Sequence, residues 1–316
     1  MMRVRSFGLI WLLVGILPAL CFGQAKVGTS GAQFLEIGIS ARAVGMAEAF
    51  IAVADDASAV YYNPGALTQL DERDVVLTHI DYPADINYEF AGIAYPTNQF
   101  GGGVVGAFFC MLDAGDMVLR TPLLSGQTPD ASTGKTFTAN SYALGVSYAR
   151  NLTDRFSIGL NLKYIAELYE EESASGWGMD LGTLYRTGFR GFKIAMVLSN
   201  FGPDLKFIRE EYPLPMNFKF GACVDLLTRE EHKAVFNLEG SHPSDNMERY
   251  NAGLEYWYKG RFALRVGQQF EYDTGGFSAG GGVKFELSNY TIKLDYGYHD
   301  FGYLSDVHRF SLGLNF

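Results

Sequence analysis

The sequence predicts an all-β protein, a transmembrane antiparallel β-barrel of about 14 strands with a small N-terminal plug, or hatch, in its lumen. Two observations lead to this fold class. After Gly23 no stretch of about 18 apolar residues follows, so no helix of the mature chain is expected to span a bilayer. From residue 74 onward, apolar side chains alternate with polar ones along segments of about ten residues, the length of a tilted membrane strand.

The last segment of the chain shows this alternation most clearly. Successive side chains of a strand point to opposite faces, so the segment has one apolar and one polar face. Alternation alone is equally compatible with a soluble β-sandwich, whereas a sheet in lipid must close to leave no unpaired edge. The apolar parity holds Phe310, Leu312, Leu314 and Phe316, and the polar parity holds Arg309, Ser311, Gly313 and Asn315.

The lengths and connections of the segments favour the barrel. Most reach the about 9–11 residues of a membrane strand, beyond the about 5–6 of a soluble one. Long connections, such as 113–137 and 201–215, follow odd-numbered segments, and tight ones follow even-numbered segments, as expected for short periplasmic turns. The predicted segments are 74–80, 86–96, 102–112, 138–149, 155–169, 177–187, 191–200, 216–226, 233–241, 249–258, 261–272, 276–287, 290–299 and 307–316.

The polar parity would point into the lumen, where charges of mixed sign can pair. Glycines on this parity fit bends or a packing partner that comes close to the wall. The predicted inward charges are Lys163, Asp180, Lys193, Lys219, Asp225, Glu255, Arg265, Lys284, Glu286, Lys293, Asp295 and Arg309, and the predicted inward glycines include Gly145, Gly159, Gly182, Gly221, Gly253 and Gly267.

Residues 1–23 have the pattern of a secretory signal peptide. Arg3 and Arg5 precede an apolar run, and compact residues follow it, so cleavage is expected after Gly23. Lipidation at Cys21 is disfavoured, because Leu20 stands where a small residue is needed. The predicted organisation is a signal peptide at 1–23, a hatch at 24–73 and an outer-membrane barrel at 74–316.

Composition excludes several classes of function. Hydrophobic residues at 48% and charged residues at 19% exclude a disordered chain. The formal charge of −10 argues against nucleic acid as a partner, because phosphates need a basic face. Three cysteines are too few for a disulfide scaffold.

No motif for catalysis survives inspection. Gly134-Lys135-Thr136 resembles the end of a phosphate-binding loop, but Pro129 occupies the position of its first glycine. The five histidines lack metal-ligand spacing, and no nucleophile–base pattern is present. The acidic run 170–172 reads as a solvated outer loop, with a calcium site as the alternative. We therefore expect no enzyme, no cofactor and no metal site.

The segment 24–73 carries motifs of a known family. The run Ala54-Asp-Asp-Ala-Ser58 followed by Tyr62-Asn-Pro-Gly-Ala-Leu67 resembles the hatch of the long-chain fatty-acid transporter (FadL-like) superfamily of outer-membrane barrels. Gly28–Leu35 (GTSGAQFL) and Ala41–Phe50 (ARAVGMAEAF) resemble more specifically its PorV/PorQ branch, which is associated with type IX secretion. The motifs cover residues 28–70.

The resemblance implies roles for four hatch residues, Asp55, Asp56, Asn63 and Pro64, which in the family anchor the hatch to the barrel wall. From chemistry alone, Asn-Pro is a turn signal, and paired aspartates are a helix cap or a salt-bridge partner in the lumen. Relatives lack the Gly65 that follows Pro64, and branch members often have Gly in place of Glu48.

Two functions from different classes remain. The resemblance implies an outer-membrane component of type IX secretion or attachment, whose outer loops bind secreted cargo or a surface-anchored partner. The alternative is passive transport of hydrophobic small molecules such as long-chain fatty acids across the outer membrane of a Gram-negative bacterium. Either function would use apolar residues of the outer loops, namely Met117, Leu119, Leu123, Leu124, Phe201, Leu205, Phe207 and Ile208.

Overall fold

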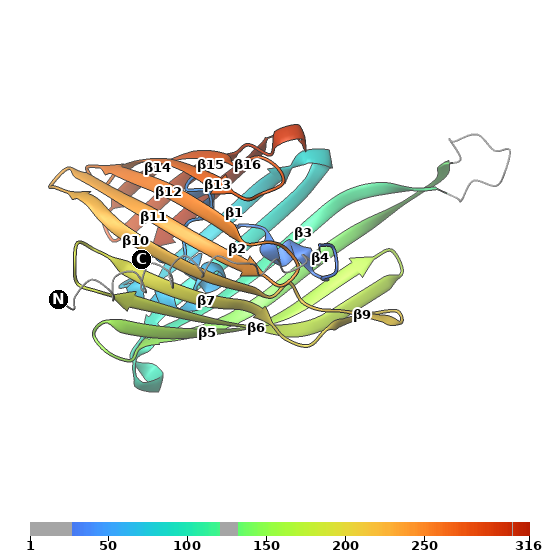
Figure 1. Cartoon of the computed structure of the whole chain (residues 1–316), viewed down its shortest axis with the longest axis horizontal. Helices are drawn as coiled ribbons and strands as arrows, with labels where there is room; N and C mark the ends of the chain where they lie inside the picture. Colours follow the sequence, from blue (N-terminus) through green and yellow to red (C-terminus); the bar gives the residue numbers. More distant parts are fainter. Residues whose placement is uncertain (1–26, 121–131, 305) are drawn as a thin grey trace, which may run out of the picture.

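The computed structural model describes residues 27–120, 132–304 and 306–316, which form a closed ring of strands around an N-terminal segment (Figure 1). The predicted signal peptide and its cleavage site lie outside these residues, as do Leu123 and Leu124. Within them the barrel has fourteen antiparallel strands, which confirms the predicted fold class. Among the described helices, none is long and apolar enough to cross a membrane.

Strand β1 (Asp74–Tyr82) closes the ring by pairing antiparallel with β16 (Val307–Asn315). Two further short strands, β8 (Leu205–Phe207) and β9 (Glu210–Tyr212), form a separate hairpin. The remaining barrel strands are β2 (Ile86–Thr97), β3 (Gly103–Arg120), β4 (Ser132–Asn151), β5 (Phe156–Tyr169), β6 (Glu172–Arg186), β7 (Lys193–Phe201), β10 (Asn217–Thr228), β11 (His232–Pro243), β12 (Arg249–Tyr258), β13 (Phe262–Phe270), β14 (Phe277–Leu287) and β15 (Tyr290–His299).

The two faces of the wall differ as the alternation predicts. On β16, Phe310 and Leu312 are 54% and 43% exposed on the outside, whereas Arg309 and Ser311 are 4% and 7% exposed on the inside. An apolar outer face matches lipid, and the polar inner face meets the enclosed segment. The apolar parity thus forms the membrane surface, and most of the buried core lies within the ring.

The predicted connection 113–137 is wrong over most of its length. Strands β3 and β4 continue through it, with Met117 paired to Phe137 and Val118 to Thr136. A register shift between Asp113 and Asp116 interrupts the alternation of apolar and polar residues. The sequence pattern therefore does not predict that β3 continues beyond this point. The predicted contrast between long and tight connections is also incomplete, because β5 and β6 are joined by Glu170 and Glu171 alone. The acidic run is therefore a tight turn that leads into β6.

The hatch, taken here as residues 27–73, lies inside the ring of strands (Figure 1). Its backbone forms short turns of helix because small residues and caps dominate, and most side chains from Ile39 to Leu67 are buried. The hatch elements are η1 (Gln33–Glu36), α2 (Ala41–Val44), α3 (Ala59–Tyr62) and η2 (Pro64–Gln69), and short 3-10 turns elsewhere are η3 (Pro83–Asp85), η4 (Gln99–Gly101) and η5 (Gly302–Leu304).

Inward glycines leave room for the hatch. A Cβ atom at Gly159 would lie 2.3 Å from the carbonyl carbon of Pro64, and one at Gly253 would lie 2.5 Å from the Met46 carbonyl oxygen. These distances are far below contact, so the wall at these positions tolerates no side chain. The expectation of a packing partner close to the inner wall holds at these two positions.

Candidate functional site: the hatch contacts and the outer mouth

A buried arginine joins the hatch to the barrel wall. Arg42 of α2 donates from Nε and Nη2 to the two carboxylate oxygens of Glu255 on β12, at 2.8 and 2.9 Å. Its Nη1 donates to Asp55 and, at 3.4 Å, to Asp56. On the wall, Nε of Arg265 donates at 2.8 Å to Oε1 of Glu255, the oxygen that also accepts from Nε of Arg42. Arg265 also donates to Asp295. Two arginines and four carboxylates therefore form one network, in which the planar guanidinium of Arg42 fits Glu255 bidentately.

The predicted aspartates have different local partners. Asp56 accepts a hydrogen bond from the backbone N–H of Ser58 at 2.9 Å and another from the Ser58 hydroxyl, just before α3 begins. The bond from Asp56 to the N–H two residues on is an Asx turn that leads into α3, whereas the N-cap position itself is Ser58. Asp55 is the more exposed of the two and meets Arg42. Burial by itself would lower the pKa of Arg42, but Asp55 and Glu255 outweigh it and raise that pKa above its usual range.

Asn63 and Pro64 form the turn that the Asn-Pro signal predicts. Asn63 caps η2 by accepting from the Gly65 N–H at 2.9 Å, and Pro64 occupies the first turn of that helix. The Asn63 amide donates to the carbonyl of Ile51 at 2.8 Å and to that of Thr183 on β6 at 3.2 Å. This side chain thus bonds both the hatch and the wall.

Gly65 lies directly against the wall. A Cβ atom there would be 2.6 Å from the carbonyl oxygen of Gly182 on β6. A Cβ at Gly182 would in turn be 2.1 Å from Asn63 Oδ1. Glycine on both sides is what lets the two backbones approach this closely.

Further contacts between hatch and wall come from inward-facing side chains of the strands. Glu239 on β11 accepts from the backbone N–H groups of Phe50 and Ile51 at 3.0 and 3.2 Å. Arg309 on β16 donates to the Gly38 carbonyl at 3.1 Å, and Ser311 accepts from the Ala41 N–H at 3.0 Å. No motif singles out Glu239 or Arg42, although strand parity places Glu239 on the inside.

Glu48 lines a polar cavity of about 340 Å³ inside the barrel, together with Glu36, Lys219, Asn251 and Arg309 among others. Its Oε1 atom is buried without a hydrogen-bond partner among the described residues. Burial raises the pKa of Glu48, while the charges of Arg309 and Lys219 act in the opposite direction. The Glu48 carboxylate therefore faces the lumen cavity.

The β8–β9 hairpin stands at the end of the barrel away from Arg73 and Phe316, an end called here the outer mouth (Figure 1). Leu205 is buried, Phe207 lies 5.4 Å from the ring of Tyr169, and Ile208 at the tip is 66% exposed. A cavity of about 560 Å³ lies between this hairpin, the end of β5 and hatch residues 30–33.

The predicted loop residues are only partly brought together. Phe207 and Ile208 line this mouth cavity. Phe201 ends β7 and is 50% exposed, while Met117 and Leu119 lie on the extension of β3 and do not line the cavity. Hatch residues hold the hairpin in place: Gly31 donates its N–H to the Pro213 carbonyl at 3.0 Å.

The described residues contain no group of three or more His, Cys, Asp or Glu side chains placed to hold a metal ion. The ionic network inside the barrel consists of paired charges that join the hatch to the wall.

This barrel with an enclosed hatch belongs to a recognised class of outer-membrane proteins, and solved structures share its fold at low identity. A Pseudomonas aeruginosa FadL homologue has a TM-score of 0.57 at 11% identity, covering 89% of this chain and 98% of that one. The Pseudomonas putida toluene transporter TodX has a TM-score of 0.54 at 10% identity, covering 82% and 92%. The Ralstonia pickettii toluene transporter TbuX has a TM-score of 0.54 at 12% identity, covering 86% and 96%.

Family comparison then narrows the class. The family described as type IX secretion system protein PorV matches residues 22–243. Because this is more than half of the chain, the protein belongs to the PorV family, and the resemblance drawn from residues 28–70 is confirmed. Its place is the outer membrane of a Gram-negative bacterium, as predicted. A search of curated proteins finds no match.

Proposed function

We propose that this barrel is a non-enzymatic component of a type IX-like secretion system that binds secreted cargo or a surface-anchored partner at its outer mouth. The observation that carries the proposal is the β8–β9 hairpin. It presents Ile208, 66% exposed, beside a cavity of about 560 Å³ that an apolar side chain of a partner could enter.

The hatch supports a binding role over a conducting one. Residues 27–73 occupy the lumen and are tied to the wall by the Arg42 network, by Asn63 and by Glu239. In this proposal Asp55, Asp56, Asn63 and Pro64 anchor the hatch, residues 24–73 form it, and residues 1–23 direct export. A fixed hatch gives the partner a rigid floor beneath the mouth.

The alternative, passive transport of a hydrophobic small molecule, needs an apolar route through the lumen. The lumen cavity is instead lined by Glu36, Glu48, Lys219 and Arg309. Desolvating such charges for an apolar ligand is costly, so the mouth is the better-supported site.

The test replaces Ile208 with Asp and measures surface display of secreted cargo in cells that carry only the variant. Loss of display is expected, because a carboxylate at the tip cannot enter an apolar contact. The matched control is Phe189→Asp, a side chain with the same exposure of 66% in the turn between β6 and β7 at the opposite end. Normal display with Ile208→Asp, or an equal loss with Phe189→Asp, would contradict the proposal.

A further inference from the structure

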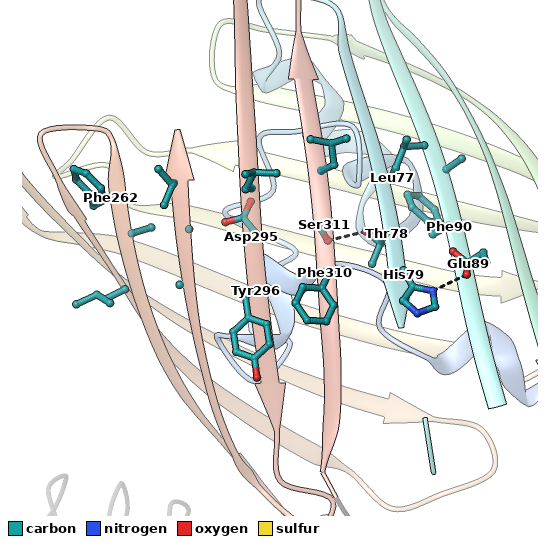
Figure 2. A pocket seen from close by; sticks show the side chains of 18 of the residues that line it. Leu77, Thr78, His79, Glu89, Phe90, Phe262, Asp295, Tyr296, Phe310 and Ser311 are labelled. Atoms are coloured by element: carbon teal, nitrogen blue, oxygen red, sulfur yellow. Dashed lines mark hydrogen bonds and ion pairs between the residues drawn. The ribbon is translucent and has the colours of Figure 1, made fainter. Parts of the chain in front are cut away.

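The lipid-facing wall carries a histidine and a glutamate that are hydrogen-bonded to each other across neighbouring strands. His79 on β1 and Glu89 on β2 occupy directly paired positions, and the His79 Nδ1 and Glu89 Oε1 atoms are 2.6 Å apart. Both side chains are about half exposed, on the same parity as Leu77 and Ile93, which are 47% and 45% exposed. The pair thus faces the membrane and is turned away from the lumen (Figure 2).

The depth of the pair makes this placement unusual. Tyr95 marks the lower end of β2, where Arg73 packs on its ring at 4.7 Å. Glu89 is six residues further along the strand, or about 15 Å along the membrane normal for a rise of about 3.3 Å and a tilt of about 40°. The apolar band of an outer-membrane barrel is about 25 Å tall. Both side chains therefore lie within this height, where unsatisfied polar atoms are costly.

The outward apolar run of β1 and β2 ends at this pair, because Asp81 and Asn87 occupy the next outward positions. On β5 the outward positions are apolar at every step from Phe156 to Leu168. On β1 the outward run ends after Leu77, and Asp81 follows His79. Lipid that packs against β1 therefore meets polar side chains after fewer outward positions than lipid that packs against β5.

The pair borders a groove of about 1170 Å³ in the outer face of the wall. Figure 2 shows His79 and Glu89 beside Phe310 and Tyr296 of the next two strands, with Phe262 across the groove. Gly281 lines the groove from β14. A Cβ added there would come no closer than 3.7 Å to its nearest neighbour, so the space beside it is open. Most residues that line the groove are apolar, with Thr78, Asp295 and Ser311 as polar exceptions besides the pair at its edge, a combination that suits an amphiphile.

We propose that this groove binds a zwitterionic phospholipid, with its acyl chains in the groove and its headgroup on the His79–Glu89 pair. The bond between Nδ1 and Oε1 leaves the His79 Nε2 atom and the second Glu89 oxygen without another partner among the described residues. An imidazole N–H suits a phosphate oxygen, and a carboxylate suits an ammonium group. A nitrogen-bearing ring and a carboxylate side by side complement a headgroup that carries a phosphate and an ammonium group.

The test measures lipid retention by native mass spectrometry. The full-length protein in mild detergent is offered phosphatidylethanolamine and phosphatidylglycerol with identical acyl chains. The wild-type protein should retain phosphatidylethanolamine with a preference of about tenfold. The double variant His79→Leu/Glu89→Leu, which restores an apolar face and should fold, is expected to lose that preference. The control Phe218→Leu/Phe220→Leu alters two lipid-facing side chains of β10, each 45% exposed, and should keep it.

Three results would overturn the assignment. Equal retention of the two lipids by the wild-type protein, or an unchanged preference in the double variant, would show that the pair does not select a headgroup. Disulfide cross-linking between copies through Leu312→Cys, a groove position 43% exposed, would instead give the groove to a second copy of the chain.

Discussion

Replacing Arg42 with Met removes the charge that joins the hatch to the wall. Breaking a buried ion pair by deleting one partner costs about 3–5 kcal/mol, because the other charge is left buried. The lower end of this energy range applies here, because both carboxylates keep another hydrogen bond. Glu255 still accepts from Arg265 at 2.8 Å, and Asp56 still accepts from the Ser58 N–H at 2.9 Å. We therefore expect a loss of about 3 kcal/mol, which corresponds to an about hundredfold larger population of the undocked hatch.

Hydrogen exchange followed by mass spectrometry measures that population. Amides such as those of Val44 and Gly45, which bond within the hatch, should exchange about a hundredfold faster in Arg42→Met. Amides in the strand ladders should be unaffected, because the barrel closes on itself. The control Lys259→Met removes a half-exposed surface pair with Glu231 and should change neither set. Unchanged exchange of the hatch amides in Arg42→Met would refute the assignment of Arg42 as the main link between hatch and wall.

Two further predictions concern the hatch. Gly65→Ala should lower the melting temperature of the protein, because the added Cβ would lie 2.6 Å from the Gly182 carbonyl oxygen. The control Gly281→Ala should not lower it, because the nearest contact of its Cβ is at 3.7 Å. Equal melting temperatures for the two variants would contradict this prediction. Burial raises the pKa of Glu48 above its ordinary value of 4.5, so the folded protein holds this proton longer than the unfolded chain and should lose stability as the pH rises through and above 4.5. Glu48→Gln should remove this slope in thermal unfolding measured across pH, and a variant that is less stable than wild type at pH 7 would refute the argument.

Sequence patterns predict the barrel well because lipid imposes a period of two on every strand. In β16 the alternation of Phe310 and Leu312 with Arg309 and Ser311 is a direct consequence of that rule. The turn in the hatch could also be predicted from the sequence, because Asn63 and Pro64 form it with the neighbouring Gly65.

Contacts between segments far apart in the sequence could not be predicted from the sequence. Arg42 and Glu255 are separated by 213 positions, and nothing in either neighbourhood states that they meet. The extension of β3 was hidden because the shift between Asp113 and Asp116 breaks the alternation. The membrane-facing His79–Glu89 pair could not be predicted, because only the register between β1 and β2 sets these two positions side by side.

The central claim is that the protein acts by binding a partner at its outer mouth above a fixed hatch. A photo-crosslinking amino acid placed at position 208 in secreting cells tests it most directly, with position 189 as the matched exposed site at the other end. We predict adducts with secreted or surface-anchored proteins at position 208 and none of these at position 189. The absence of protein adducts at position 208, in cells that display their cargo normally, would contradict the claim.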